Sequence, residues 1–226
     1  GESPRQQARV TYYARDARDV VLKGRYLETT FDMKSANEDV AQFCRDHGPR
    51  YIGFAGVDPN TGMTAVRDLE YAVRDLGLRG LNLQCFELKL AINDKRMYPL
   101  YAKCIELDVP VNIHCGMNFS AETTIHYGHP SGLDEVLVHF PELRVCASPP
   151  GWPWVNELLA VAWRHPGLWI RLVSVSPKLL TTPDSGYGTL LQDGTLLLMD
   201  RLLFGFGFPL LPCDRSTPAF RVLSVD

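Results

Sequence analysis

The sequence predicts an α/β protein with the architecture of a TIM-type (β/α)8 barrel that lacks one strand–helix unit. Short apolar, β-branched runs recur along the chain, and each is followed by a segment with helical spacing of its apolar residues. Such alternation gives a parallel sheet with right-handed crossovers, as a doubly wound open sheet or as a barrel. No GxGxxG or GxxxxGK[ST] pattern follows the first strand, which favours the barrel.

Seven runs have the composition of buried strands, whereas a complete barrel needs eight units over about 250 residues. The chain has 226 residues, so we expect a single domain, residues 1–226, with one unit missing, apparently the first. Residues 19–31 are strongly charged, and we expect an extended loop there rather than a strand. The expected strands are residues 9–13, 51–57, 80–84, 109–114, 143–147, 168–174 and 202–206.

Helices are predicted between these strands by capping residues and by apolar residues at helical spacing. The first is signalled by the cap sequence of residues 35–38, and the second by Val66, Leu69, Val73 and Leu76 on one face. The remaining helices are expected at residues 97–107, 133–140, 154–163 and 190–199.

Composition excludes several classes of protein. The formal charge of −3 includes no polybasic block, so nucleic acid is not an expected partner. No apolar stretch approaches the roughly 20 residues that span a bilayer, and the polar first residues do not resemble a signal peptide. The six cysteines form no CxxC pair, which is typical of buried thiols in a reducing compartment. We therefore expect a cytoplasmic protein without a membrane partner.

Polar residues at the ends of two neighbouring strands indicate a site. His114 ends an otherwise apolar strand and shares a face with Asn112, because alternate side chains of a strand point the same way. Asn82 and Gln84 share a face on the preceding strand in the same manner. Catalytic groups of barrels lie at the carboxyl ends of strands, and a buried histidine needs a partner or a task.

Other polar residues follow strands but have structural explanations as well. Asp16, Asp58 and Ser148 come directly after three of the expected strands. Asp58 precedes Pro59 and also fits a turn or a helix cap. Cys115 is a conceivable nucleophile, although no neighbour in sequence is an evident activating base.

Several motifs in fixed order resemble one known family. They are YIGFAGVDP (51–59), GLRGLNL (77–83), the segment from Asp94 through YPLY (98–101) to VNIH (111–114), LDEV (133–136), FPEL (140–143), GWPW (151–154), and LFG (203–205) with Pro209. Together they are similar to the amidohydrolase-2 branch of the amidohydrolase superfamily. That branch includes aminocarboxymuconate-semialdehyde decarboxylase and related aromatic acid decarboxylases.

The resemblance implies a (β/α)8 barrel with a divalent metal, typically zinc. Its ligands are an HxH on the first strand, a histidine ending the fifth and an aspartate ending the eighth, and a histidine ending the sixth is the base. His114 matches the fifth-strand ligand, whereas Pro149 stands at the position of the base and Gly207 at that of the aspartate. No HxH occurs in the chain. One histidine does not supply the three protein ligands of a catalytic zinc, so His114 is a metal ligand only if a metal is bound.

The sequence therefore predicts a divergent enzyme of this family, a hydrolase or a non-oxidative decarboxylase (a carbon–carbon lyase), that acts on a small carboxylated or aromatic substrate. The usual metal–water mechanism is not expected, and the resemblance implies a homodimer or a higher homo-oligomer. We expect His114 to be the acid/base. The second carboxylate would be Asp16 or Asp58, and the substrate-binding residues are expected to be Asn82, Gln84, Asn112, Ser148 and Trp152.

Two alternatives remain open. The barrel could be a non-catalytic binding or assembly protein, since Pro149 and Gly207 have replaced functional residues of the family. The chain could also be a fragment without its first unit, which would leave sheet edges unpaired. The second alternative explains the absent HxH but not Pro149 or Gly207, because both lie inside the chain.

Overall fold

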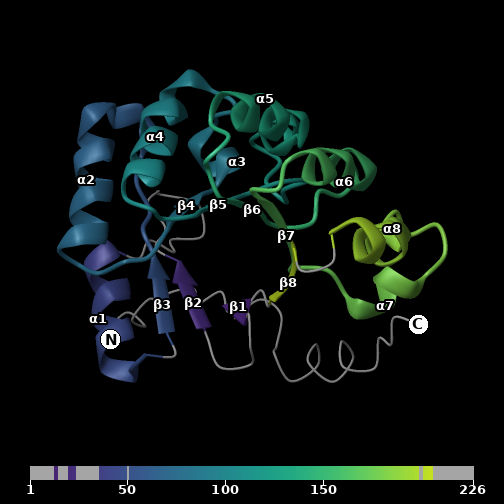
Figure 1. Ribbon diagram of the computed structural model, residues 1–226, viewed down its shortest axis with the longest axis horizontal. Helices are drawn as coiled ribbons and strands as arrows, with labels where there is room; N and C mark the ends of the chain where they lie inside the picture. The colour runs from purple at the N-terminus through teal and green to yellow at the C-terminus, as the bar shows by residue number, and fades with distance from the viewer. Residues whose placement is uncertain (1–12, 15–19, 24–35, 50, 199–200, 206–226) are drawn as a thin grey trace.

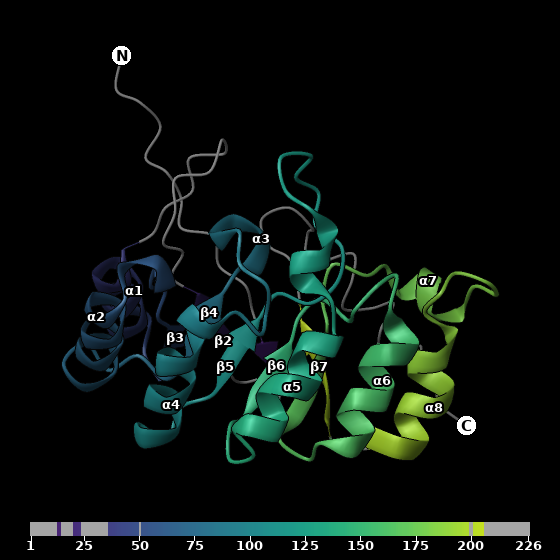
Figure 2. The ribbon, with the colours of Figure 1, turned by 90° about the horizontal axis from the view of Figure 1, so that it is seen from above.

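The strands of the protein curve around a common centre, with helices on the outside (Figure 1). The computed structural model describes residues 13–14, 20–23, 36–49, 51–198 and 201–205. Helices α2 (Met63–Arg74), α4 (Tyr98–Glu106), α5 (Ser131–His139), α6 (Val155–Arg164) and α8 (Gly188–Leu198) succeed one another around the outer side of the strands in both views (Figures 1 and 2). The fold is of the (β/α)8 type and is partly incomplete, as the alternation of strands and helices predicted.

Most of the wall is one sheet of six strands, which is continued by a pair. The order in the sheet is β1 (Tyr13–Ala14), β8 (Leu202–Gly205), β7 (Leu168–Leu172), β6 (Val145–Ala147), β5 (Val111–Ile113) and β4 (Leu81–Leu83). The pair consists of β2 (Val20–Lys23) and β3 (Tyr51–Phe54). A bridge from Ala55 to Leu81 joins β3 to β4, and β2 lies beside β1, so the wall almost returns to its start (Figure 1).

Two expectations about the first strands were wrong. Residues 20–23, inside the segment expected to be a loop, form β2 and pair in parallel with β3. The short run Val20-Val21-Leu22 is enough for a strand. Because charged residues flank it, the segment 19–31 taken as a whole looked too polar for one. In addition, β1 pairs antiparallel with β8, with Tyr13 opposite Gly205, so the sheet is not parallel throughout.

The helices occur where their spacing predicted them. They are α1 (Asn37–His47), α2 (Met63–Arg74), α4 (Tyr98–Glu106), α5 (Ser131–His139), α6 (Val155–Arg164) and α8 (Gly188–Leu198). Shorter helices lie in the loops: α3 (Cys85–Leu88), α7 (Pro177–Thr181), η1 (Pro59–Thr61), η2 (Lys95–Met97) and η3 (Ile125–Gly128). No helix in the described ranges is both long and apolar enough to cross a membrane.

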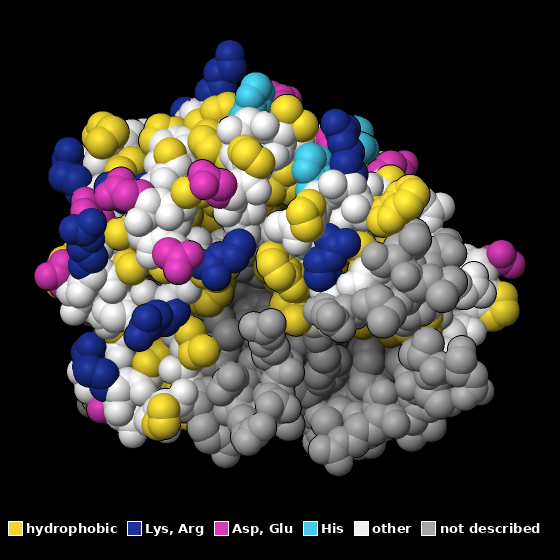
Figure 3. Space-filling view, viewed as in Figure 1, with side chains coloured by type: hydrophobic (Ala, Val, Ile, Leu, Met, Phe, Trp, Pro, Cys, Tyr) yellow, Lys and Arg dark blue, Asp and Glu magenta, His cyan; other side chains and the backbone are white. Residues whose placement is uncertain are grey.

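The core lies between the strands and the helices. Leu81, Leu83, Val111 and Ile113 are at most 1% exposed, and they pack in one cluster with apolar residues of the helices such as Leu69 of α2. Because side chains of a strand alternate, the residues between these positions face the inside of the barrel. The outer surface has interspersed charges of both signs over α2 and α4 (Figure 3).

Close packing around Gly53 in β3 gives a test of this core. A Cβ atom on Gly53 would lie 2.5 Å from Cδ2 of Leu78 and 2.8 Å from Cγ1 of Val40. We expect Gly53→Ala to lower the free energy of unfolding by about 1–3 kcal/mol, the usual cost of overpacking, in urea denaturation. Gly188→Ala is the control, because nothing lies within 4 Å of the added carbon at the start of α8. Equal stability of the two variants would contradict this packing.

Candidate functional site

The register of β4 to β7 places polar residues at matching levels inside the barrel. Leu83 is opposite Ile113, Ile113 opposite Ala147, and Ala147 opposite Ile170. These apolar residues belong to the core, so the residues that follow them have the opposite orientation. We call the four following residues the upper ring; they are Gln84, His114, Ser148 and Arg171. The lower ring lies two residues earlier and consists of Asn82, Asn112, Cys146 and Trp169.

His114 of the upper ring is enclosed by two segments from other parts of the chain. Its side chain is buried, with 7% of the residue exposed. The ring of Phe86 in α3 contacts it edge to face, with ring centroids 4.7 Å apart. A Cβ atom at Gly128 of η3 would lie 3.2 Å from Nδ1 of His114. His114 therefore lies at the carboxyl end of β5, as predicted. The residues that cover it, Phe86 and Gly128, come from other segments and were not predicted.

Glycine at position 128 allows η3 to lie this close. The amide of Gly116 donates to the carbonyl of Gly128 at 2.7 Å, and a Cβ atom on Gly128 would collide with the carbonyl oxygen of Gly116. Gly116 has a φ of 105°, a conformation that side chains disfavour. Both glycines thus fix the loop after β5 over His114.

The three amide side chains predicted to bind substrate form one hydrogen-bonded group. Nδ2 of Asn112 donates to Oδ1 of Asn82 at 3.0 Å, and Nε2 of Gln84 donates to the same oxygen at 3.3 Å. Asn82 and Asn112 are buried, and burial of an amide is costly unless it is hydrogen-bonded. The structure therefore brings these residues together and orients them through one another.

Ser148 and Arg171 form a second polar pair on the neighbouring strands. Nη2 of Arg171 donates to Oγ of Ser148, and both residues are buried. Burial lowers the pKa of the Arg171 guanidinium from its usual value. Arg171 was not among the site residues predicted from the sequence. The alternation that singled out Asn112 and His114 would have found it, because Arg171 interrupts the apolar strand Leu168–Leu172.

Trp152 lies between the loops that follow β5 and β7. Its carbonyl oxygen accepts from the amide of Met117 at 2.7 Å. A Cβ atom at Gly186, between α7 and α8, would lie 3.0 Å from the indole Nε1. Trp152 is 37% exposed, so part of it borders solvent. Its role in substrate binding stays a prediction.

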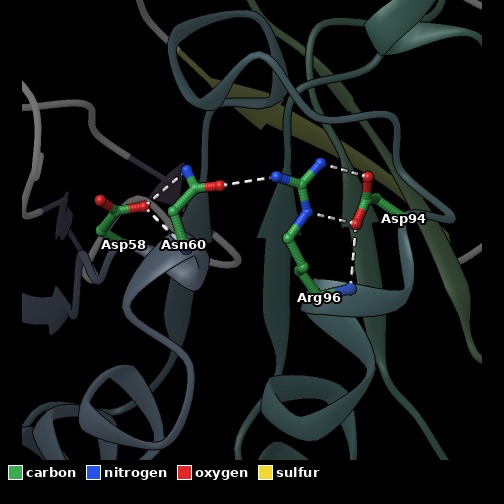
Figure 4. A network of polar contacts seen from close by, with 4 residues as sticks. All are labelled: Asp58, Asn60, Asp94 and Arg96. Atoms are coloured by element: carbon green, nitrogen blue, oxygen red, sulfur yellow. Dashed lines mark hydrogen bonds and ion pairs between the residues drawn. The ribbon is translucent and has the colours of Figure 1, made fainter.

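Asp58 belongs to a network of loop contacts (Figure 4). Its carboxylate caps η1 by accepting from the backbone and side-chain nitrogens of Asn60, both at 2.9 Å. Oδ1 of Asn60 accepts from Arg96 at 2.9 Å, and Arg96 forms a two-pronged pair with Asp94 at 2.9 and 2.8 Å. Asp58 thus caps a helix, which is the structural role that its sequence context also fitted. Asp16 lies outside the described residues, and a catalytic role of either carboxylate stays a prediction.

Cys115 is deeply buried, and its thiol is not activated. Burial raises the pKa of this thiol well above its usual value, and the neighbouring Cys85 raises it further. A thiol reacts as the thiolate, so a raised pKa makes it a poor nucleophile. The structure supports the structural interpretation of Cys115.

The described residues do not fit the metal that the family resemblance implies. Among them, no group of three or more histidine, cysteine, aspartate or glutamate residues could hold an ion. The rings of His126 and His129 lie 6.2 Å apart, but no third histidine, cysteine, aspartate or glutamate among the described residues completes a set of metal ligands with them. A catalytic zinc normally takes three protein ligands, so no step of the chemistry below is assigned to a metal.

Comparison with known proteins agrees with the fold and the motifs. The model of the amidohydrolase family matches residues 5–223. The chain therefore belongs to the amidohydrolase family, as the motifs predicted.

Individual relatives include decarboxylases. The chain is 23% identical to gamma-resorcylate decarboxylase from Rhizobium sp. (strain MTP-10005) over 228 residues, covering 85% of this chain and 70% of that protein. An uncharacterised TIM-barrel protein from Bordetella bronchiseptica is 30% identical, with a TM-score of 0.80 over 92% of this chain and 72% of that one. 5-Carboxyvanillate decarboxylase from Sphingomonas paucimobilis shares the fold, with 16% identity and a TM-score of 0.63 over 84% of this chain and 66% of that one.

The ion pair of Asp94 and Arg96 is expected to make the stability of the fold depend on pH. The hydrogen bond from Arg96 lowers the pKa of Asp94, so the pair stabilises the folded state above the unfolded pKa of an aspartate. This stabilisation is lost as pH falls through the lower, folded pKa. We expect Arg96→Gln to melt at a slightly lower temperature at neutral pH, and the difference to vanish in acid. A difference that is constant with pH would contradict this origin.

Burial of the thiols predicts their order of reaction. Cys115 is fully buried, whereas Cys44 and Cys146 are partly exposed. We expect brief treatment of the folded protein with iodoacetamide at pH 8 to leave Cys115 unlabelled in peptide mass spectrometry, and labelling in denaturant is the control. Preferential labelling of Cys115 in the folded protein would show an activated thiol.

Proposed function

We propose that this protein is a non-oxidative decarboxylase, a carbon–carbon lyase, that acts on a small aromatic carboxylate. The observation on which this depends is the buried histidine, His114, within a ring of polar side chains at the carboxyl ends of β4 to β7. In this family the matched relatives include decarboxylases of two aromatic acids, which favours decarboxylation over hydrolysis. A cytoplasmic location and a homodimer remain expectations from the sequence.

The proposed reaction replaces the carboxylate of the substrate by a proton. His114 in its protonated form donates a proton to the ring carbon that bears the carboxylate. The carbon–carbon bond to the carboxylate then breaks, its electron pair returns to the ring, and carbon dioxide leaves. Water returns a proton to the imidazole. The amides of Asn82, Gln84 and Asn112 would orient the ring by hydrogen bonds to its substituents.

A second candidate function is binding without catalysis. Pro149 favours it, because proline occupies the position of the family's base and its side chain can neither accept nor donate a proton. The two candidates differ in one measurement, release of carbon dioxide from a bound aromatic acid. A protein that binds such acids and releases none would be a binding protein.

Substitution of His114 tests the proposed role. We expect His114→Asn to lower kcat for decarboxylation by roughly 10²- to 10⁴-fold, the usual contribution of a general acid. The measurement is release of carbon dioxide from gamma-resorcylate and from 5-carboxyvanillate. His139→Asn is the control, because this histidine ends α5 on the outside of the barrel. Unchanged kcat in His114→Asn would remove His114 from the mechanism.

A further inference from the structure

Arg171 is a charged residue on the interior face of β7. Ala147 pairs with Ile170 and with Ile113, so Arg171 lies at the level of Ser148 and His114 on three successive strands. Only 3% of Arg171 is exposed. Arginine keeps its charge in proteins, so burial places a cation inside the barrel.

The neighbouring strand makes room for this side chain. A Cβ atom on Gly205 of β8 would lie 2.8 Å from Cδ of Arg171 and 3.2 Å from its Nε. Glycine therefore leaves the space through which the stem of the arginine passes. On the other side, Nη2 donates to the hydroxyl of Ser148, which fixes the direction of the guanidinium toward β6.

Another arginine shows how this chain uses the residue for structure alone. Nη1 of Arg201 donates to the carbonyl oxygens of Ala162, His165 and Leu168, at 2.6, 2.9 and 3.3 Å. It thereby ties the end of α6 to the beginning of β7. Arg171 lies instead on the interior face of the barrel, in the ring that contains His114.

We propose that Arg171 binds the carboxylate of the substrate inside the barrel, with Ser148 as the group that positions its guanidinium. This inference rests on the proposed function and assigns the substrate an anionic group. A planar guanidinium matches the two oxygens of a carboxylate, and such charged hydrogen bonds are stronger than neutral ones. Neighbouring strands are about 4.8 Å apart, so Arg171 and His114 lie two strand spacings from each other at the same interior level.

Direct binding to the intact protein tests this assignment. The probes are 2,6-dihydroxybenzoate and its uncharged amide, 2,6-dihydroxybenzamide, measured by calorimetry. We expect the wild-type protein to prefer the acid, and Arg171→Met to lose roughly tenfold to hundredfold in affinity for the acid, as for a lost charged hydrogen bond, with little change for the amide. Arg171→Lys should retain part of the preference. Arg164→Met, which removes an exposed arginine at the end of α6, should bind both probes as the wild type does.

Stability separates this role from a structural one. Replacing a buried charge by an apolar residue of similar size is often neutral or stabilising. We therefore expect Arg171→Met to melt at the wild-type temperature or above it, while it loses the preference for the acid. If this variant does not fold, Ser148→Ala and Arg171→Lys provide the test, and each should weaken binding of the acid more than binding of the amide.

Three outcomes would overturn the inference. They are undiminished binding of the acid by Arg171→Met, equal loss of the acid and the amide, and no binding of 2,6-dihydroxybenzoate by the wild-type protein. Failure of the proposed function would be seen in a different measurement, the release of carbon dioxide from the bound acid. A protein that binds the acid through Arg171 but releases no carbon dioxide would retain the anion site and lose the catalytic role.

Discussion

Backbone hydrogen bonds beyond the ends of β5 and β6 determine how His114 and Ser148 are placed in the candidate site. The amide of His114 donates to Leu83 at 2.8 Å, that of Ser148 to Ile113 at 3.0 Å, and that of Cys115 to Ser148 at 3.2 Å. These bonds extend the strand pairing to the residues that face the interior. A slip of one residue would turn each of these side chains toward the helices, because successive residues of a strand face opposite sides. The composition of the candidate site thus depends on the register of these strands.

The polar interior is costly, and the apolar outer layer offsets this cost. Amides and a guanidinium lose hydration inside the barrel and must be hydrogen-bonded there. The facing residues of the same strands, such as Leu83 and Ile113, are almost completely buried against the helices. Each of these strands therefore combines an apolar face against the helices with a polar face toward the interior. This division explains how a chain with an ordinary content of apolar residues, 46%, can hold a buried charge.

Period-two spacing predicted much of the fold and part of the site. It placed His114 and Asn112 on one face, and that face is buried as expected. It missed β2, whose four residues are surrounded by charges, and Arg171, which was regarded as part of an apolar run. The contacts of His114 with Phe86 and Gly128 could not be predicted, because they join segments that are far apart in sequence. Asp58 shows a different limit, since a carboxylate after a strand fits both a cap and a catalytic group, and in the structure this one caps η1.

The space beside Gly205 makes two positions of the chain depend on each other in evolution. A Cβ atom at this position would lie 2.8 Å from Cδ of Arg171, so a larger residue than glycine requires the stem of the arginine to shift. Once Arg171 is replaced by a smaller residue, the constraint on Gly205 disappears and a larger residue could fill the space. Substitutions at the two positions are therefore expected to be non-additive.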